Sequence, residues 1–291
     1  MVTNSSQVNL AARSDKLSEL QKCSRKGEML ELYQFEISHY CEKVRLILDY
    51  KGLTYKKIEV TPGIGQIDLY RMSGQRKVPV LKDGSEIIAD STAIAKYLER
   101  KYPERPIIPT NPQQRALCYL IEELADESIG QKSRKALFSG LSQSQNFRTS
   151  ILPSTTPDFL KQLVAAVPSD LLNVLGLGVG MTPDVVQSAL DDLKQILESL
   201  SMLLFDKPYL VADQPTLADF AVAGLSMYIK FPDGPYLDIP PDLRGKGVPG
   251  IADSITFDTF FNWRDQLYAQ YRKPLTATSS PASGPTSIQI D

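Results

Sequence analysis

Two short stretches carry residue types that could bind or activate a small molecule. Asp90 and Ser91 stand directly before an apolar helical pattern, so a carboxylate, a hydroxyl and free backbone N–H groups meet at a helix start. This end of a helix favours a bound anion such as a carboxylate. Ser38 stands at a second predicted helix start, where its hydroxyl could serve as an N-cap or as a hydrogen-bond donor to a ligand.

A proline inside a strand pattern marks a third feature of interest. Pro79 interrupts the run of β-formers Val78–Leu81, and proline inside a strand is normally confined to an edge or a bend. We therefore predict a cis Val78–Pro79 bond, which would turn the backbone groups of Val78 outward. The Asp83-Gly84 pair that follows is a hairpin signal.

Composition excludes several classes of function. The chain has 291 residues, 42% of them hydrophobic, and a formal net charge of −2, which gives no overall field to attract nucleic acid. No apolar stretch reaches the ~18 residues of a membrane span. The three cysteines are far apart and His39 is the only histidine, so we predict no metal site and disfavour a Ser-His-Asp hydrolase. Separated free thiols indicate a reducing compartment.

The elements expected to position these residues form an α/β pattern followed by an all-helical one. Four prolines at 103, 106, 109 and 112 form a stiff connector between the two. The predicted first part has strands at 29–34, 54–60, 78–81 and 86–89, helices at 40–51 and 90–102, Gly52 as a C-cap, and a loop at 62–65.

Helical periodicity continues from Gln113 to the last third of the chain. Thr-Pro-Asp helix starts occur at 156–158 and 182–184, and Thr216 with Asp219 resembles a capping box. We expect an apolar face at Leu117, Leu120, Ile121 and Leu124, and a last helix over about 257–272. The polar segment 139–155 and the glycine-rich segment 171–181 have no assigned structure; the second could be a buried connector, a mobile lid or a contact surface.

Three motifs together resemble the cytosolic glutathione S-transferase family. Ser38–Arg45 is similar to the family's active-site turn and first helix, Val78–Leu81 with Asp90–Ile94 to its glutathione-binding segment, and Pro215–Phe220 to the capping box of its helical domain. The turn is closest to the serine-type and omega-like members. The motifs occur in the family's order, and they cover residues 29–105 and 205–230 well.

The resemblance implies a two-domain fold, with a thioredoxin-like α/β domain followed by an all-α helical-bundle domain. We accordingly predict a polar N-terminal extension at 1–28, a glutathione-binding domain at 29–103, a linker at 104–112, the helical domain at 113–273 and a disordered tail at 274–291. A processed targeting segment is the alternative for residues 1–28.

The resemblance also implies roles for particular residues. Ser38 would stabilise the thiolate of glutathione, and Tyr40 would line the sulfur pocket. The remaining glutathione-binding residues fall in two groups: Lys77, Val78 and Pro79 at the glycyl and cysteinyl parts, and Asp90 and Ser91 at the γ-glutamyl end. Asp90 stands where many relatives have glutamate.

Two further residues near Ser38, His39 and Cys41, could have tuning or redox roles. His39 replaces the family's usual proline, and we expect it to face solvent, with tuning of the thiolate as the alternative. Cys41 lies on the inward face of the predicted helix, and we expect it to be a small core residue rather than a nucleophile.

The resemblance implies an enzyme that binds reduced glutathione as co-substrate and activates its thiol for attack on a small hydrophobic electrophile, as in detoxification. A cytoplasmic homodimer is expected, without a nucleic-acid partner, and membrane contact is open but not favoured. The alternatives are a glutathione-dependent reductase or isomerase using Cys41, and a non-catalytic binding or assembly module.

Overall fold

The computed structural model describes residues 29–61, 64–143 and 182–275, together with Asp158, Gln162, Ala165 and Ala166. The side chains of Ile64 and of residues 138–143 are not described. The predicted N-terminal extension, the helix start at 156–158, most of the segment 139–155, the segment 171–181 and the tail from 276 lie outside these residues.

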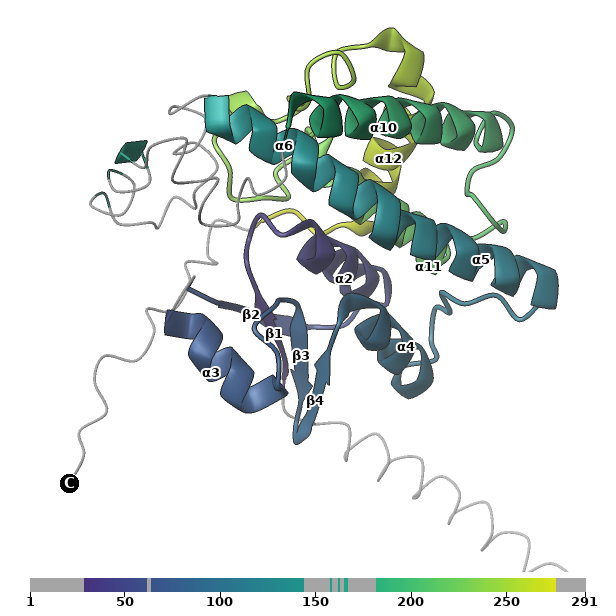
Figure 1. The fold of residues 1–291 in the computed structure, drawn as a ribbon. Coiled ribbons are helices and arrows are strands. Elements are labelled where there is room, and N and C mark those ends of the chain that lie inside the picture. Colours follow the sequence, from purple (N-terminus) through teal and green to yellow (C-terminus); the bar gives the residue numbers. More distant parts are fainter. Residues whose placement is uncertain are drawn as a thin grey trace, which may run out of the picture.

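A four-stranded sheet forms the first part of the chain (Figure 1). Its order is β2-β1-β3-β4, with β1 parallel to β2 and antiparallel to β3, and β3 antiparallel to β4. The strands are β1 Leu30–Gln34, β2 Tyr55–Glu59, β3 Val80–Asp83 and β4 Glu86–Ala89. The hairpin at Asp83-Gly84 is confirmed, and the third strand begins two residues later than predicted.

Helices cover both faces of this sheet. They are α2 His39–Tyr50, α3 Ile64–Ser73 and α4 Ser91–Lys101. Leu32 and Leu81 of the strands pack with α2 and α4, whereas Tyr33 and Val80 pack with Leu69 of α3. Because successive strand residues point to opposite faces, α3 lies across the sheet from the other two helices. The sheet domain is therefore thioredoxin-like, as predicted.

Helix α3 corrects the sequence prediction, which placed a loop at 62–65 and assigned nothing to the residues that follow. Among the described side chains of this helix, Leu69 is the one buried hydrophobic residue, while Ile67 and Tyr70 are half exposed, at 51% and 52%. A helix that buries so little apolar surface leaves almost no periodic pattern to recognise. Gly65 close to its start added a misleading turn signal.

The rest of the described chain consists of helices joined by turns and irregular segments, the longest of them over 229–254, and its described strand-type pairing is one isolated bridge between Lys230 and Gly247. Figure 1 shows α5 and α6 following one another along one rod, with α11 near the centre of the molecule. The α-helices are α5 Pro112–Leu124, α6 Gln131–Gln143, α10 Pro183–Leu203, α11 Leu217–Leu225 and α12 Asp258–Tyr271. A π-helical segment, Ala125–Gly130, joins α5 to α6.

Helix α11 is the buried centre of the helical domain, and every one of its residues is buried. The Asp219 carboxylate accepts hydrogen bonds from the backbone N–H of Thr216, at 2.7 Å, and of Leu210, at 2.8 Å. These bonds confirm the predicted capping signal. A Cβ on Gly224 would lie 2.6 Å from the backbone N of Lys43, so only glycine allows α11 to approach α2 this closely.

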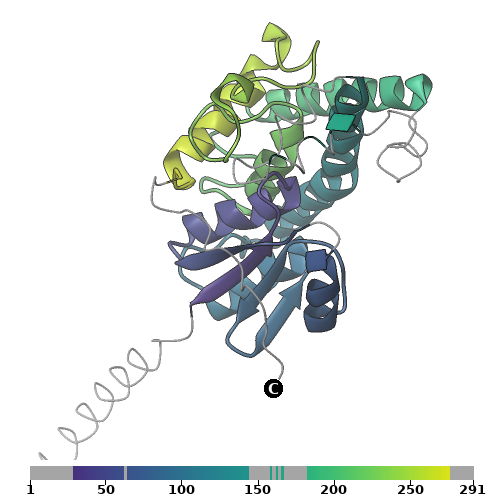
Figure 2. The same cartoon turned by 90° about the vertical axis from the view of Figure 1, so that its left-hand side faces the viewer.

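Helix α2 lies between the sheet and the helical domain, as Figure 2 shows, and nearly all of its residues are buried. Its buried charges pair across the domains. Arg272, just after α12, donates to Glu42 at 2.9 Å and to Asp49 at 2.7 Å. Lys43 donates to Glu122 at 2.6 Å and to Asp126 at 2.8 Å. The domains are thus joined by two groups of buried ion pairs.

The predicted apolar face of α5 is only partly in the core. Ile121 is buried, but Leu117, Leu120 and Leu124 are 41%, 68% and 38% exposed. The spacing correctly predicted one face of a helix, yet that face turns away from α11. The Thr182-Pro183 start of α10, with the Thr182 hydroxyl accepting from Val185 N at 3.4 Å, is confirmed, as is the last helix.

Candidate glutathione site

Strand pairing brings the three predicted site segments to one edge of the sheet. Val80, at the start of β3, is opposite Tyr33 near the end of β1 and opposite Ala89 at the end of β4. The chain therefore leaves β1 toward Ser38, enters β3 from Val78-Pro79 and leaves β4 toward Asp90 at the same edge. Segments separated by some fifty residues of sequence meet because antiparallel neighbours run in opposite directions.

Ser38 is the N-cap of α2. Its Oγ accepts a hydrogen bond from the Cys41 N–H at 3.3 Å, and its side chain is half-buried. A serine hydroxyl that accepts one bond still has a hydrogen to donate. The position therefore combines a hydroxyl donor with the positive end of a helix, and both would stabilise a thiolate placed there.

Val78 and Pro79 are joined by a cis peptide bond, as predicted. Pro79 is buried and Val78 is half-buried against the α3 side of the sheet. Lys77 directly before them is exposed, and the ion pairs found among the described residues do not include it. A backbone segment and a lysine are thus presented beside the Ser38 turn.

Asp90 and Ser91 form the N-terminus of α4. Asp90 has φ +81°, a conformation that non-glycine residues rarely adopt, and Oδ1 accepts from Thr92 N at 3.0 Å and Ala93 N at 2.9 Å. Ser91 is buried. Strained residues of this kind cluster at ligand-binding sites, where the surrounding structure holds them in place. The strain at Asp90 supports the predicted ligand-binding role of this turn.

His39 corrects the expectation of a solvent-facing side chain. It is 3% exposed, and its Nε2 lies 3.1 Å from the carbonyl oxygen of Gly130 in the π-helical segment. Burial lowers the pKa of His39 to about 3, with Arg134 adding to the effect and the Gly130 bond opposing it. The imidazole is therefore neutral, and its Nε2–H is the donor because a carbonyl only accepts.

Tyr40 also contacts the helical domain. Its hydroxyl donates to the Asp126 carbonyl at 2.9 Å, and the side chain is half-buried. Burial and the Asp126 carboxylate raise the pKa of Tyr40 to about 12, so the phenol stays protonated. The ring lies beside the Ser38 turn, but its hydroxyl is hydrogen-bonded to the π-helical segment.

Cys41 is wholly buried, and burial raises the pKa of its thiol to about 11. Nucleophilic cysteines have lowered pKa values and some exposure. The structure therefore places Cys41 in the core, as expected, and its environment does not suit a redox nucleophile. Cys118, from α5, is likewise a free, buried thiol.

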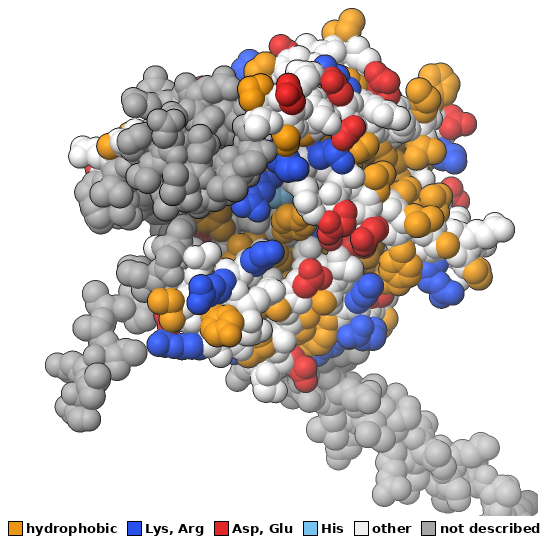
Figure 3. Space-filling model, viewed as in Figure 1, with side chains coloured by type: hydrophobic (Ala, Val, Ile, Leu, Met, Phe, Trp, Pro, Cys, Tyr) orange, Lys and Arg blue, Asp and Glu red, His pale blue; other side chains and the backbone are white. Residues whose placement is uncertain are grey.

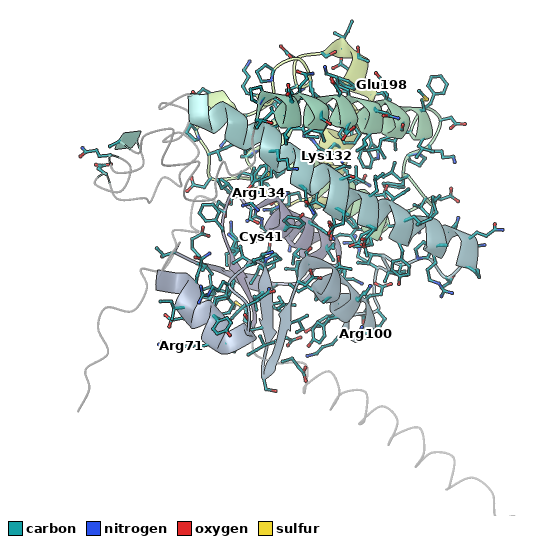
Figure 4. The ribbon with its side chains drawn as sticks, in the orientation of Figure 1. Cys41, Arg71, Arg100, Lys132, Arg134 and Glu198 are labelled. Carbon is teal, nitrogen blue, oxygen red and sulfur yellow. The ribbon has the colours of Figure 1, made fainter. Side chains whose placement is uncertain are left out.

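A hollow between the two domains adjoins these residues. Figure 3 shows apolar side chains within it and Lys and Arg side chains on its rim. Figure 4 places Arg134 of α6 on the helical-domain side of Cys41. Sequence reasoning missed Arg134, the Tyr228 ring 4.1 Å from the His39 ring, and Gly130. No local signal could have revealed them, since each lies far from Ser38 in the sequence.

The described residues contain no group of three or more His, Cys, Asp or Glu side chains arranged to hold a metal ion. None of their helices is long and apolar enough to cross a membrane.

Comparison with known proteins gives this site a family. Residues 32–106 match the family model for the glutathione S-transferase N-terminal domain. The chain is 36% identical over 109 residues to glutathione S-transferase 1 of Dianthus caryophyllus, an alignment that covers 36% of this chain and 49% of the relative. Residues 32–106 of this chain are therefore a glutathione S-transferase N-terminal domain. Members of the family bind glutathione.

A second relative matches this chain over a similar length. The zeta-class glutathione S-transferase of Euphorbia esula is 36% identical over 103 residues, covering 34% of this chain and 46% of the relative. The chain thus spans about half the length of the curated relatives it matches. The family-model match at residues 32–106 corresponds to the sheet domain.

Solved structures extend the likeness to the helical domain at the level of fold. A beta-etherase of Sphingobium, 19% identical, has a TM-score of 0.61 over 83% of this chain and 96% of its own. A glutathione S-transferase of Rhodospirillum rubrum, 21% identical, has a TM-score of 0.58 over 88% and 96%. The transferase-like arrangement of a sheet domain followed by helices is therefore present across most of the chain.

Proposed function

We propose that this protein is a glutathione transferase in which the Ser38 hydroxyl stabilises the thiolate of bound glutathione. The observation that carries the proposal is the meeting of Ser38, Val78 and Asp90-Ser91 at one sheet edge beside the hollow between the domains. The backbone of Val78 would hold the cysteinyl part of glutathione, with Lys77 and Pro79 beside it. The α4 N-terminus at Asp90-Ser91 would hold the γ-glutamyl carboxylate.

The chemistry required of the site is small. The thiol of glutathione loses its proton to solvent, and the hydroxyl of Ser38 donates a hydrogen bond to the resulting thiolate. The sulfur electron pair then forms a C–S bond, and in a substitution the leaving group departs with the electron pair of the bond it breaks. A free thiol titrates near ~8.5, and lowering that value by one unit needs only about 1.4 kcal/mol of preferential stabilisation.

Calorimetric titration with reduced glutathione tests the binding site. We expect binding in the micromolar to millimolar range that weakens in Ser91→Ala, whose hydroxyl is buried at the α4 N-terminus. Thr110→Ala is a matched control, because Thr110 precedes α5 and lies away from the sheet edge. Absence of any heat at protein concentrations that would detect millimolar binding would overturn the assignment.

Ser38→Ala tests catalysis. The structural neighbour Ure2p5 of Phanerochaete chrysosporium was crystallised with S-glutathionyl-dinitrobenzene, so chlorodinitrobenzene is a suitable first electrophile. We expect kcat to fall by about a hundredfold, as for loss of an oxyanion donor, while glutathione affinity changes little. Unchanged turnover in Ser38→Ala would remove Ser38 from the mechanism.

A non-catalytic binding module is the second candidate. Besides transferases, the relatives include a stringent starvation protein A homolog of Pasteurella multocida, 26% identical over 102 residues. Asp90, in place of the glutamate of many transferases, is a departure consistent with this alternative. Glutathione binding without turnover of any electrophile would favour it.

The exposed leucines of α5 support a homodimer. Leu117, Leu120 and Leu124 form an apolar face outside the core, and a second copy of the chain would remove that face from water. Leu120→Glu should convert a dimer to monomers in light scattering after size-exclusion chromatography, whereas Glu123→Gln on the same helix should not. A monomeric wild-type protein would refute the dimer. We place this activity in the cytoplasm, where Cys41 and Cys118 would remain reduced.

A further inference from the structure

The π-helical segment Ala125–Gly130 is the point where the helical domain contacts the active-site turn. π-helical turns are rare, and they occur frequently at functional sites. Two successive side chains at the start of α2 bond to this segment: His39 Nε2 to the Gly130 carbonyl at 3.1 Å, and Tyr40 Oη to the Asp126 carbonyl at 2.9 Å. Both belong to the residues immediately after Ser38.

His39 is held on every side. Its ring lies 4.5 Å from the Tyr40 ring and 4.1 Å from the Tyr228 ring, and only 3% of the residue is exposed. Among the described residues, its buried Nδ1 has no hydrogen-bond partner. An unsatisfied buried nitrogen is costly, so the single Nε2–H bond is the polar interaction that orients this ring.

Gly130 completes the contact. A Cβ at this position would lie 2.8 Å from Tyr40 Oη, which is nearer than ordinary contact, and 3.4 Å from His39 Nε2. The absence of a side chain therefore lets the two α2 side chains reach the π-helical carbonyls. The Gly130 carbonyl also accepts from Ser133 Oγ at 3.2 Å, which ties it to α6.

We propose that His39 is a positioning residue, which through its hydrogen bond to Gly130 holds the Ser38 hydroxyl in the place where it meets the sulfur of glutathione. This rests on the proposed role of Ser38. One peptide bond separates His39 from Ser38, so a shift of the imidazole moves the serine. A proline in this place would have no side-chain donor, and the turn would have no such tie to the helical domain.

His39→Leu, His39→Gln and Gly130→Ala test the proposal, with Glu123→Gln as a control on exposed α5 surface. Leucine fills the space without a donor, glutamine restores an N–H donor, and Gly130→Ala displaces Tyr40 and His39 while keeping both side chains. The readouts are the calorimetric affinity for reduced glutathione, kcat with chlorodinitrobenzene, and the pH titration of the bound thiolate by its ultraviolet absorbance.

We expect His39→Leu and Gly130→Ala to lose at least about tenfold in kcat, since displacement of a reacting group by about 1 Å can cost a hundredfold. Their bound thiol should titrate about one unit higher, and glutathione affinity should stay within about threefold. His39→Gln should recover most of kcat. A merely structural role would lower melting temperature without raising the pKa of the bound thiol.

The outcomes separate this inference from the function it rests on. If the wild-type protein fails to ionise bound glutathione, the proposed function fails whatever the variants do. If the wild type ionises it and Ser38→Ala does not, but His39→Leu and Gly130→Ala match the wild type in kcat and thiol pKa, the positioning role of His39 is refuted. Failure of glutamine to rescue a folded His39→Gln protein would also refute it.

Discussion

Helix α2 contacts the helical domain by two kinds of interaction. At its start, His39 and Tyr40 make single neutral hydrogen bonds to backbone carbonyls, and His39 Nδ1 has no hydrogen-bond partner among the described residues. Farther along, Glu42 and Asp49 pair with Arg272, and Glu42 also accepts from Arg45 at 2.5 Å.

The difference shows where this protein can tolerate weak interactions. Charged groups without solvent must be fully paired, so the ionic contacts of α2 are costly to disturb. The neutral contacts adjoin the proposed sulfur site, where a small displacement of Ser38 would change chemistry without unfolding the chain. We therefore expect substitutions at the ionic contacts to change mainly stability and those at the neutral contacts to change mainly turnover.

The largest effect should come from Arg272→Met. This change leaves Asp49 buried without its arginine partner and Glu42 paired with Arg45 alone, and breaking a buried pair in this way costs about 3–5 kcal/mol. Urea unfolding followed by circular dichroism measures the loss. Arg71→Gln, which removes an exposed ion pair with Asp68, should cost less than about 1 kcal/mol. Equal stability of the two variants would break the comparison.

Acid should weaken the ion pairs of Glu36, which lies just before α2 and pairs with Arg45 and Lys57. Burial alone would raise the pKa of Glu36, but Arg45 and Lys57 outweigh it and lower the pKa to about 2. A carboxyl whose folded pKa lies below its unfolded value of 4.5 stabilises the protein above that value and loses the contribution as pH falls toward 2. The contribution is about 3 kcal/mol.

Glu36→Gln is the variant that isolates this term. Between pH 5 and pH 2 its free energy of unfolding should fall by less than that of the wild type. The difference should be about 1.4 kcal/mol for each unit by which folding lowers the pKa of Glu36. Denaturant titrations at a series of pH values measure the slope. Superimposable slopes would show that Glu36 is not held in its ionised form.

Gly224→Ala should have an intermediate effect on stability and sharpen the comparison from the side of α11. The new Cβ would meet the Lys43 backbone N at 2.6 Å, so the two helices must move apart. Overpacking of this kind costs about 1–3 kcal/mol. Thermal unfolding measures it, and Ala223→Gly serves as a control that removes a buried methyl on the same helix without adding bulk. A Gly224→Ala protein as stable as the wild type would show that α2 and α11 can accommodate a methyl group between them.

Cys41→Ala should have the smallest effect on activity. Burial raises the pKa of this thiol to about 11, so it is protonated at neutral pH and is not a nucleophile. We expect turnover per folded molecule within about twofold of wild type, with a loss of about 1 kcal/mol in stability from the removed core atom. A large loss of turnover with unchanged stability would instead revive the reductase alternative.

Local signals predicted much of the fold correctly. Helix ends were predicted correctly from single residues, because caps depend on one or two neighbouring residues. These residues are Ser38, Gly52, Asp90, Thr182 and Thr216. The Asp83-Gly84 hairpin and the cis bond before Pro79 were likewise predicted from neighbouring residues. These features also brought the candidate site residues to the right element ends.

Local signals did not predict helix α3 or the exposure of the apolar face of α5. Ile67 and Tyr70 are apolar yet half exposed, and Leu120 is more exposed than either. Periodicity shows that apolar residues share a face of a helix, but it does not say what covers that face. The prediction for α5 therefore identified the residues that share a face of the helix but did not show that most of that face lies outside the core.

The sequence by itself predicted most helix caps, the sheet domain and the residues proposed to bind glutathione, because these depend on caps, turns and alternation over a few positions. Only the tertiary structure decided that His39 is buried, that Tyr40 bonds to Asp126 and that Arg272 pairs with Glu42 across 230 positions. Such contacts follow from how two domains pack around α2, and a buried polar side chain takes whatever partner that packing supplies.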